Sequence, residues 1–149
     1  MLQYGIECWG KAADYILQPI KVLQKHAIRA LAGASWGEHT KPIFNKLKLL
    51  SLEGLHKRAL ASAIHRKALE GSLPLTLEHN YQFRQIQKFP PPKGWLNKKA
   101  RRQVNFQSPL FTSTLPDHLL QYIGKPSFLK KLKQHLLLDS TNSNQDQFT

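Results

Sequence analysis

Apolar residues recur at three- and four-residue steps in residues 16–31, and this spacing limits what the chain can fold into. The positions concerned are Ile16, Ile20, Leu23, Ala27 and Leu31. An α-helix gathers residues at this spacing on one side, whereas a half-buried strand would alternate apolar and polar residues. Similar spacing returns further along the chain. We therefore expect a mainly α fold, a small bundle of about five helices with a long basic, proline-containing irregular segment in the middle.

The clearest predicted helix runs from about Pro19 to Ala32 and ends at Gly33. Proline is tolerated in a first helical turn, and glycine is common just past a helix C-terminus. The side expected to be buried carries Ile20, Leu23, Ala27 and Leu31. Three basic residues at four-residue steps point away from that stripe, and we call them the basic ridge: Lys21, Lys25 and Arg29.

Two further helices are predicted before residue 71. Thr40 and Pro42 are typical cap and first-turn residues for a helix over 41–50. Ser51 opens the next helix, which extends to about Leu69 and is closed by Gly71. The second of these helices is expected to bury Leu52, Leu55, Ala59 and Ala63, with His56 at the edge of the stripe as a hydrogen-bonded boundary residue.

Periodicity is lost over 72–113, which contains the triple proline 90–92. Proline cannot occupy a helix interior without breaking it, so this segment is predicted to be a basic extended linker between a helical domain over 1–71 and a helical segment over 114–138. The polar end, 139–149, is predicted to be disordered. In the last helix Phe128, Leu129, Leu132 and Leu136 are expected to face inward.

Charge is the strongest compositional signal. Lys and Arg number 22 against 9 Asp and Glu, so the formal net charge is +13 and anionic partners, nucleic acid first, are expected. Between Glu78 and Asp117 there is no acidic residue, and basic residues alternate with aromatic ones. That pattern suits single-stranded nucleic acid, and it equally fits a solvated basic linker with a few packed aromatics.

Several classes of protein lack support in the sequence. Residues 33–37, GASWG, fit the G-x-S-x-G pattern of α/β-hydrolases, but helical spacing precedes the pattern where a strand is required. Seven histidines and one cysteine, Cys8, show no metal-ligand spacing, and isolated acids offer no paired carboxylates. We expect no enzyme activity, cofactor, metal or small-molecule substrate. Without a membrane span or signal peptide, an intracellular protein, nuclear or cytoplasmic, is expected and not a secreted one. The sequence carries no signal for oligomeric state.

Several stretches together resemble the C-terminal region, thumb and beyond, of non-LTR (LINE-type, jockey-like) retrotransposon reverse transcriptases. They are YGIECWGKA at 4–12, LQKHAIRALAGASWGEHTKPIFNKLKLLSLEGLHKRALA at 23–61, TLPDHLL at 114–120 and FLKKLKQHLL at 128–137. The residues that match the family pattern are Tyr4, Gly5, Trp9, Gln24, Lys25, Arg29, His39, Thr40, Pro42, Leu47 and Leu50.

On this resemblance the chain is expected to be part of an RNA-directed DNA polymerase that lacks the catalytic palm. The family's palm aspartates, which hold two magnesium ions, have no counterpart here, so at most sequence-independent binding of a template-primer duplex is implied. The candidate nucleic-acid-binding residues are Lys21, Lys25, Arg29, Lys41, Lys48, Lys57, Arg58, Lys98, Lys99, Arg101, Arg102, Lys130 and Lys133. The alternatives are a stand-alone RNA or single-stranded DNA binder that uses residues 81–106, a peripheral protein on anionic membrane, and an inert pseudogene-like relic.

Overall fold

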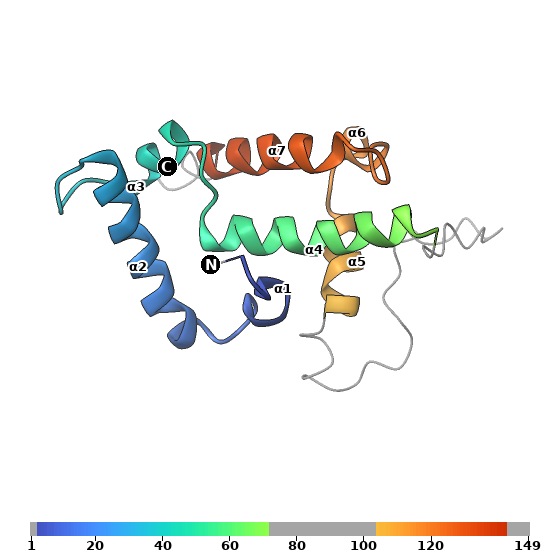
Figure 1. Cartoon of the computed structure of the whole chain (residues 1–149), viewed down its shortest axis with the longest axis horizontal. Helices are drawn as coiled ribbons and strands as arrows, with labels where there is room; N and C mark the ends of the chain where they lie inside the picture. Colours follow the sequence, from blue (N-terminus) through green and yellow to red (C-terminus); the bar gives the residue numbers. More distant parts are fainter. Residues whose placement is uncertain (1–2, 72–103, 143–149) are drawn as a thin grey trace, which may run out of the picture. The chain divides into compact units, whose positions relative to one another are not determined.

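Helices are the regular secondary structure of the residues that the computed structural model describes, 3–71 and 104–142 (Figure 1). They are α1 (Ile6–Trp9), α2 (Asp14–Ala32), α3 (Thr40–Lys46), α4 (Leu52–Leu69), α5 (Val104–Ser113), α6 (Asp117–Leu120) and α7 (Phe128–Asn142). No β-strand occurs within these two ranges. The mainly α prediction is therefore confirmed, with seven helices in the described residues where about five were expected.

The chain divides into two compact units. Unit 1 comprises Met1–Arg58 and Lys130–Thr149, and unit 2 comprises Ala59–Leu129. Helices α4 and α7 each contribute residues to both units, so the division differs from the segments 1–71, 72–113 and 114–138 expected from the sequence.

Helix α2 begins at Asp14, about five residues earlier than predicted, and Pro19 lies inside it. The acidic Asp14 in the first turn favours this earlier start, because a carboxylate interacts well with the partial positive charge of a helix N-terminus. The predicted end is confirmed. Gly33 has φ 63°, and the N–H of Ala34 donates to the carbonyl of Arg29 at 3.0 Å, which closes the last turn.

The side of α2 that was predicted to be buried is largely exposed. Leu23 and Leu31 are 66% and 72% exposed, Ala27 is exposed, and Ile20 is half-buried. The buried residues of α2 are Leu17 and Ile28. At about 100° per residue, Ile28 lies about 100° around the helix from Ala27. The apolar side of α2 is broad, and the helix packs through its edge, so the prediction chose the wrong part of it.

Helix α3 packs against α2 and is shorter than predicted. It begins at Thr40, which is buried as a helix residue and is not a cap, and it ends at Lys46, where the sequence predicted helix to residue 50. Lys48 has φ 51°, the N–H of Lys48 donates to the carbonyl of Asn45, and that of Leu49 donates to Phe44. This is the Schellman arrangement, with lysine in the left-handed position that glycine usually takes.

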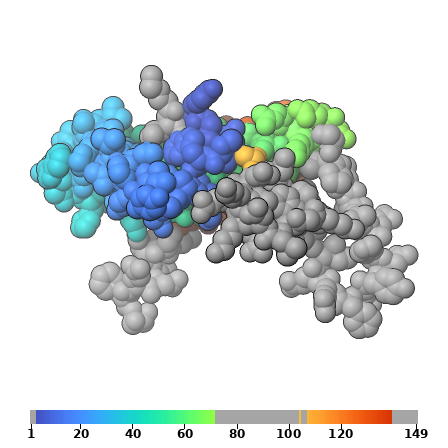
Figure 2. Space-filling model, turned by 90° about the horizontal axis from the view of Figure 1, so that it is seen from below, coloured from blue at the N-terminus to red at the C-terminus, as the bar shows by residue number. Residues whose placement is uncertain are grey.

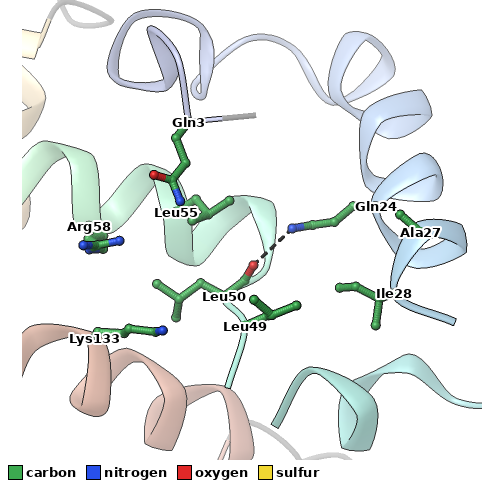
Figure 3. A pocket seen from close by; sticks show the side chains of 9 residues that line it. All are labelled: Gln3, Gln24, Ala27, Ile28, Leu49, Leu50, Leu55, Arg58 and Lys133. Carbon is green, nitrogen blue, oxygen red and sulfur yellow. Dashed lines mark hydrogen bonds between the residues drawn. The ribbon is translucent and has the colours of Figure 1, made fainter. Parts of the chain in front are cut away.

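The connection from α3 to α4 is held by Gln24 of α2 (Figure 3). Its Nε2 donates to the carbonyl of Leu50 at 3.1 Å, and its Oε1 accepts from the N–H of Leu52 at 2.9 Å. Ser51 caps α4 as predicted, since the N–H of Gly54 donates to its Oγ at 3.3 Å. One side chain of α2 therefore satisfies one of the free N–H groups at the start of α4.

Burial along α4 is broader than the single predicted stripe. Leu52 and Ala63 are buried as predicted, whereas Leu55 and Ala59 are half-buried. The helix also buries Leu60, Ala61 and Ile64. Neighbouring positions point in directions about 100° apart, so the middle of α4 is covered on more than one side.

In unit 2 the structure contains a helix that the sequence did not predict. Residues 104–113, predicted to belong to the extended linker, form α5 with Pro109 inside it. Ser108 and Thr112, one helical turn apart, bury their hydroxyl groups, and neither oxygen has a hydrogen-bond partner in the described part of the chain.

The C-terminal helices follow the predicted pattern more closely. Phe128, Leu132 and Leu136 of α7 are buried as predicted, and Leu129 is half-buried. The helix continues to Asn142, so 139–142 are helical where disorder was predicted. The predictions for 72–103 and 143–149 fall outside the described residues.

Candidate nucleic-acid interface

The basic ridge begins beside the buried face of α2 and turns away from it, because Lys21 lies about 20° around the helix from the buried Ile28 and Arg29 about 100° from it. Lys25 is exposed, whereas Lys21 and Arg29 are half-buried and each is held by a partner. Lys21 Nζ lies 3.3 Å from Asp14 Oδ1, and Arg29 Nε donates to the carbonyl of Glu38 at 2.9 Å. In Figure 2 the blue atoms of α2 face the viewer, so one side of this helix lies at the surface of its unit.

These contacts orient the ridge without neutralising it. The Lys21–Asp14 pair is exposed to water, where ion pairs are weak and a phosphate can replace the carboxylate. The Arg29 hydrogen bond uses one of the five guanidinium donors and a neutral carbonyl, so the positive charge of Arg29 remains. From Lys21 to Arg29 the three cationic groups rise by about 12 Å along α2 and rotate by about 80° around it.

The other candidate residues that the structure describes also belong to unit 1. Lys41 of α3, Lys48 just after α3, and Lys130 of α7 are exposed, and Lys57 of α4 is half-buried. The structure does not gather them into the ridge, which is confined to α2. Four candidates lie outside the described residues: Lys98, Lys99, Arg101 and Arg102.

Two of the candidate cations line a pocket of about 450 Å³ within unit 1 (Figure 3). Arg58 of α4 and Lys133 of α7 lie on the side of this pocket away from α2. The remaining lining is mostly aliphatic: Gln3, Gln24, Ala27, Ile28, Leu49, Leu50 and Leu55. Ala27 lies about 160° around α2 from Arg29, but Ile28, which also lines the pocket, lies only about 20° from Lys21, so the pocket and the ridge share a side of the helix at Lys21.

One aromatic residue beside the ridge was not predicted as a site residue. Trp36, in the loop 33–39 between α2 and α3, is 74% exposed, and its ring centroid lies 4.4 Å from that of His26 on α2. It belongs to the GASWG pattern, and the structure confirms that a helix precedes this pattern. The sequence shows a tryptophan seven residues after Arg29, but it does not show that the loop folds back onto α2.

Two of the histidines that the structure describes are buried, and burial lowers the pKa of both. His56 of α4 packs on Gly10, where a Cβ would clash with the imidazole ring. Its pKa falls through desolvation and, secondarily, through the charge of Lys11. The expected hydrogen bond is absent at Nε2, which has no partner among the described residues. His65 accepts a hydrogen bond at Nδ1 from the N–H of Gly124 at 3.0 Å, and desolvation lowers its pKa as well.

Neither a metal centre nor a membrane-spanning helix is found in 3–71 and 104–142. No group of three or more histidine, cysteine, aspartate or glutamate side chains is arranged to hold a metal ion there. None of the helices in these ranges is long and apolar enough to cross a bilayer.

Comparison with models of known protein families, with curated proteins and with solved structures gives no match to this chain. The structure and its local chemistry define a mainly helical, strongly basic protein. The resemblance to reverse transcriptase thumbs therefore stays a prediction based on the quoted residues.

Proposed function

We propose that this chain binds nucleic acid through the sugar-phosphate backbone, with little sequence preference, and that the basic ridge of α2 is the main contact. The observation that carries the proposal is the set of three cationic groups at four-residue steps on one helix, with Lys25 exposed and the half-buried Lys21 and Arg29 oriented by partners. Backbone contacts fix position on a nucleic acid and carry no sequence information directly. A net charge of +13 supplies the long-range attraction.

An RNA–DNA duplex of the template-primer type is the ligand we propose, because the ridge residues Lys25 and Arg29 also carry the resemblance to a retrotransposon reverse transcriptase thumb. In that role the chain binds the duplex and does not catalyse a reaction. The ridge fits such a role because it is about 12 Å long and α2 contains no acidic residue other than Asp14 at its start.

The test compares salt dependence of binding between the wild type and a variant without the ridge charges. In this variant Lys21, Lys25 and Arg29 are changed together to Gln. Its affinity for a fluorescein-labelled RNA–DNA duplex is measured by fluorescence anisotropy at salt concentrations from about 50 to about 300 mM, where the release of counterions makes affinity depend on salt. The slope of log affinity against log salt should fall by about 2 to 3, because each lost phosphate contact removes about 0.9.

A charge-matched control separates the ridge from general charge. Lys11, Lys46 and Arg66 are exposed and lie outside the ridge, and their joint change to Gln removes the same three charges. If both triple variants lose the same slope, the ridge assignment is wrong. The double variant Lys21→Gln with Lys25→Gln keeps the Arg29 hydrogen bond to the loop and shows whether any loss comes from loop disruption.

A second arm uses anionic liposomes in place of the duplex. Binding to liposomes without binding to duplex or single strands would replace this proposal with the peripheral membrane alternative.

A further inference from the structure

Trp36 is a large apolar side chain held at the surface beside the basic ridge. It is 74% exposed, and its one ring neighbour among the described residues is His26, with centroids 4.4 Å apart and planes inclined at 41°. Single exposed apolar residues are common and need no function. Trp36 differs because both the ring and the loop that carries it are tied to α2.

The loop is anchored at both ends. At its start, Gly33 adopts φ 63° and Ala34 donates to the carbonyl of Arg29. At its end, the N–H of Glu38 donates to the carbonyl of Ser35 at 3.1 Å, and Arg29 Nε donates to the carbonyl of Glu38. The short turn between these anchors contains Trp36, so the backbone on both sides of the indole is held to Arg29 and the indole itself lies on His26.

The ring and the ridge form one continuous surface on α2. His26, which supports Trp36, lies three residues before Arg29 and therefore neighbours it on the helix. From Arg29 the ridge extends through Lys25 to Lys21 over about 12 Å, or about three steps of a duplex strand at about 3.4 Å each. If the phosphates of a strand contacted Lys25 and Arg29, its next nucleotide would lie toward the loop that carries Trp36.

We propose that Trp36 stacks on an unpaired base that flanks the duplex held by the ridge, with His26 supporting the back of the indole. Aromatic side chains next to cationic groups bind unpaired bases by this combination, and any base can stack, so sequence independence is kept. The inference rests on the proposed function and adds to it a preference for duplexes with a single-stranded overhang. Glu38 in the same loop opposes binding, because its exposed carboxylate lies near the phosphates.

The experiment uses an RNA–DNA duplex with a short overhang whose first unpaired base is 2-aminopurine, and the same duplex with blunt ends. Binding of the wild type should quench the 2-aminopurine fluorescence and favour the overhang duplex. Trp36→Ala should abolish the quenching and reduce the affinity for the overhang duplex by about 5- to 150-fold, the effect of one lost base–aromatic stack. Its affinity for the blunt duplex should stay unchanged.

Three further variants test whether stacking on the indole causes these effects. Trp36→Phe keeps a stacking ring and should restore part of the quenching, whereas Tyr4→Ala removes another highly exposed aromatic residue and should have no effect. Glu38→Gln should raise the affinity for both duplexes. Circular dichroism establishes that each variant is folded.

The outcomes distinguish this inference from the proposed function. If the wild type binds both duplexes with a steep salt dependence and Trp36→Ala behaves identically, the stacking role is wrong and the ridge proposal stands. If the folded wild type binds no nucleic acid at low salt, both are wrong.

Discussion

Removal of the Gln24 side chain should loosen the start of α4 and lower the stability of unit 1. In Gln24→Ala the Leu52 N–H loses its acceptor and the Leu50 carbonyl loses its donor, both in a partly buried setting. An unsatisfied buried polar group costs about 1–3 kcal/mol, so we expect a loss of about 2 kcal/mol. For a chain of this size that corresponds to a fall in Tm of about 4–8 °C.

Two comparisons isolate the hydrogen bonds of Gln24 from other effects. Gln18→Ala on the same helix removes an exposed glutamine and should leave Tm nearly unchanged. Gln24→Met keeps the volume of the side chain while removing both hydrogen bonds, so it should lose nearly as much stability as Gln24→Ala. Hydrogen exchange followed by NMR should show faster exchange of the Leu52 amide. Equal Tm values for Gln24→Ala and Gln18→Ala would refute the argument.

Three further changes have expected outcomes that denaturant unfolding can measure. Thr112→Val removes a buried hydroxyl with no described partner and should stabilise by about 1 kcal/mol, whereas Thr114→Val, which loses a 2.6 Å hydrogen bond to Phe111, should not stabilise. Lys48→Gly should stabilise by about 1 kcal/mol, because glycine adopts the left-handed conformation without steric cost; no gain would contradict the assigned turn. The pKa of His65 is lowered in the folded state, so the unfolded chain binds more protons and the stability should fall as the pH drops below 6.5. His65→Asn keeps an acceptor for the Gly124 N–H and should weaken this pH dependence, and an unchanged pH profile would contradict the argument.

Local signals in the sequence predicted the C-terminal ends of α2 and α4 and the start of α4. Gly33 and Gly71 both have positive φ just past the ends of α2 and α4, and Ser51 caps α4. Each of these features depends on a few consecutive residues, so its physical cause is contained in a short stretch of sequence.

Features that depend on distant residues were not predicted. The choice of Leu17 and Ile28 over Leu23 and Leu31 as the buried side of α2 depends on where α3 and the start of α4 pack. The Gln24 hydrogen bonds join positions 26 and 28 residues apart. Helix α5 was missed because residues 104–113 were joined to the segment that contains the triple proline 90–92, in which the helical spacing of apolar residues is lost.

The candidate site was predicted in part. Four-residue spacing placed the three ridge residues on neighbouring positions of one helix, as the structure has them. The side opposite the ridge was expected to be buried and is exposed, and Lys21 shares a side of α2 with the buried Leu17 and Ile28. Trp36 was missed as a site residue, since its position beside Arg29 is created by the return of the loop through the Glu38 carbonyl.

The most direct test of the central claim is the affinity of the folded wild-type protein for an RNA–DNA duplex as a function of salt concentration. If the ridge binds the phosphates of the duplex, log affinity should fall linearly with log salt concentration, with a slope of about 3 in magnitude for three phosphate contacts. A protein that is helical by circular dichroism and yet binds neither duplex nor single strands at low salt would contradict the account.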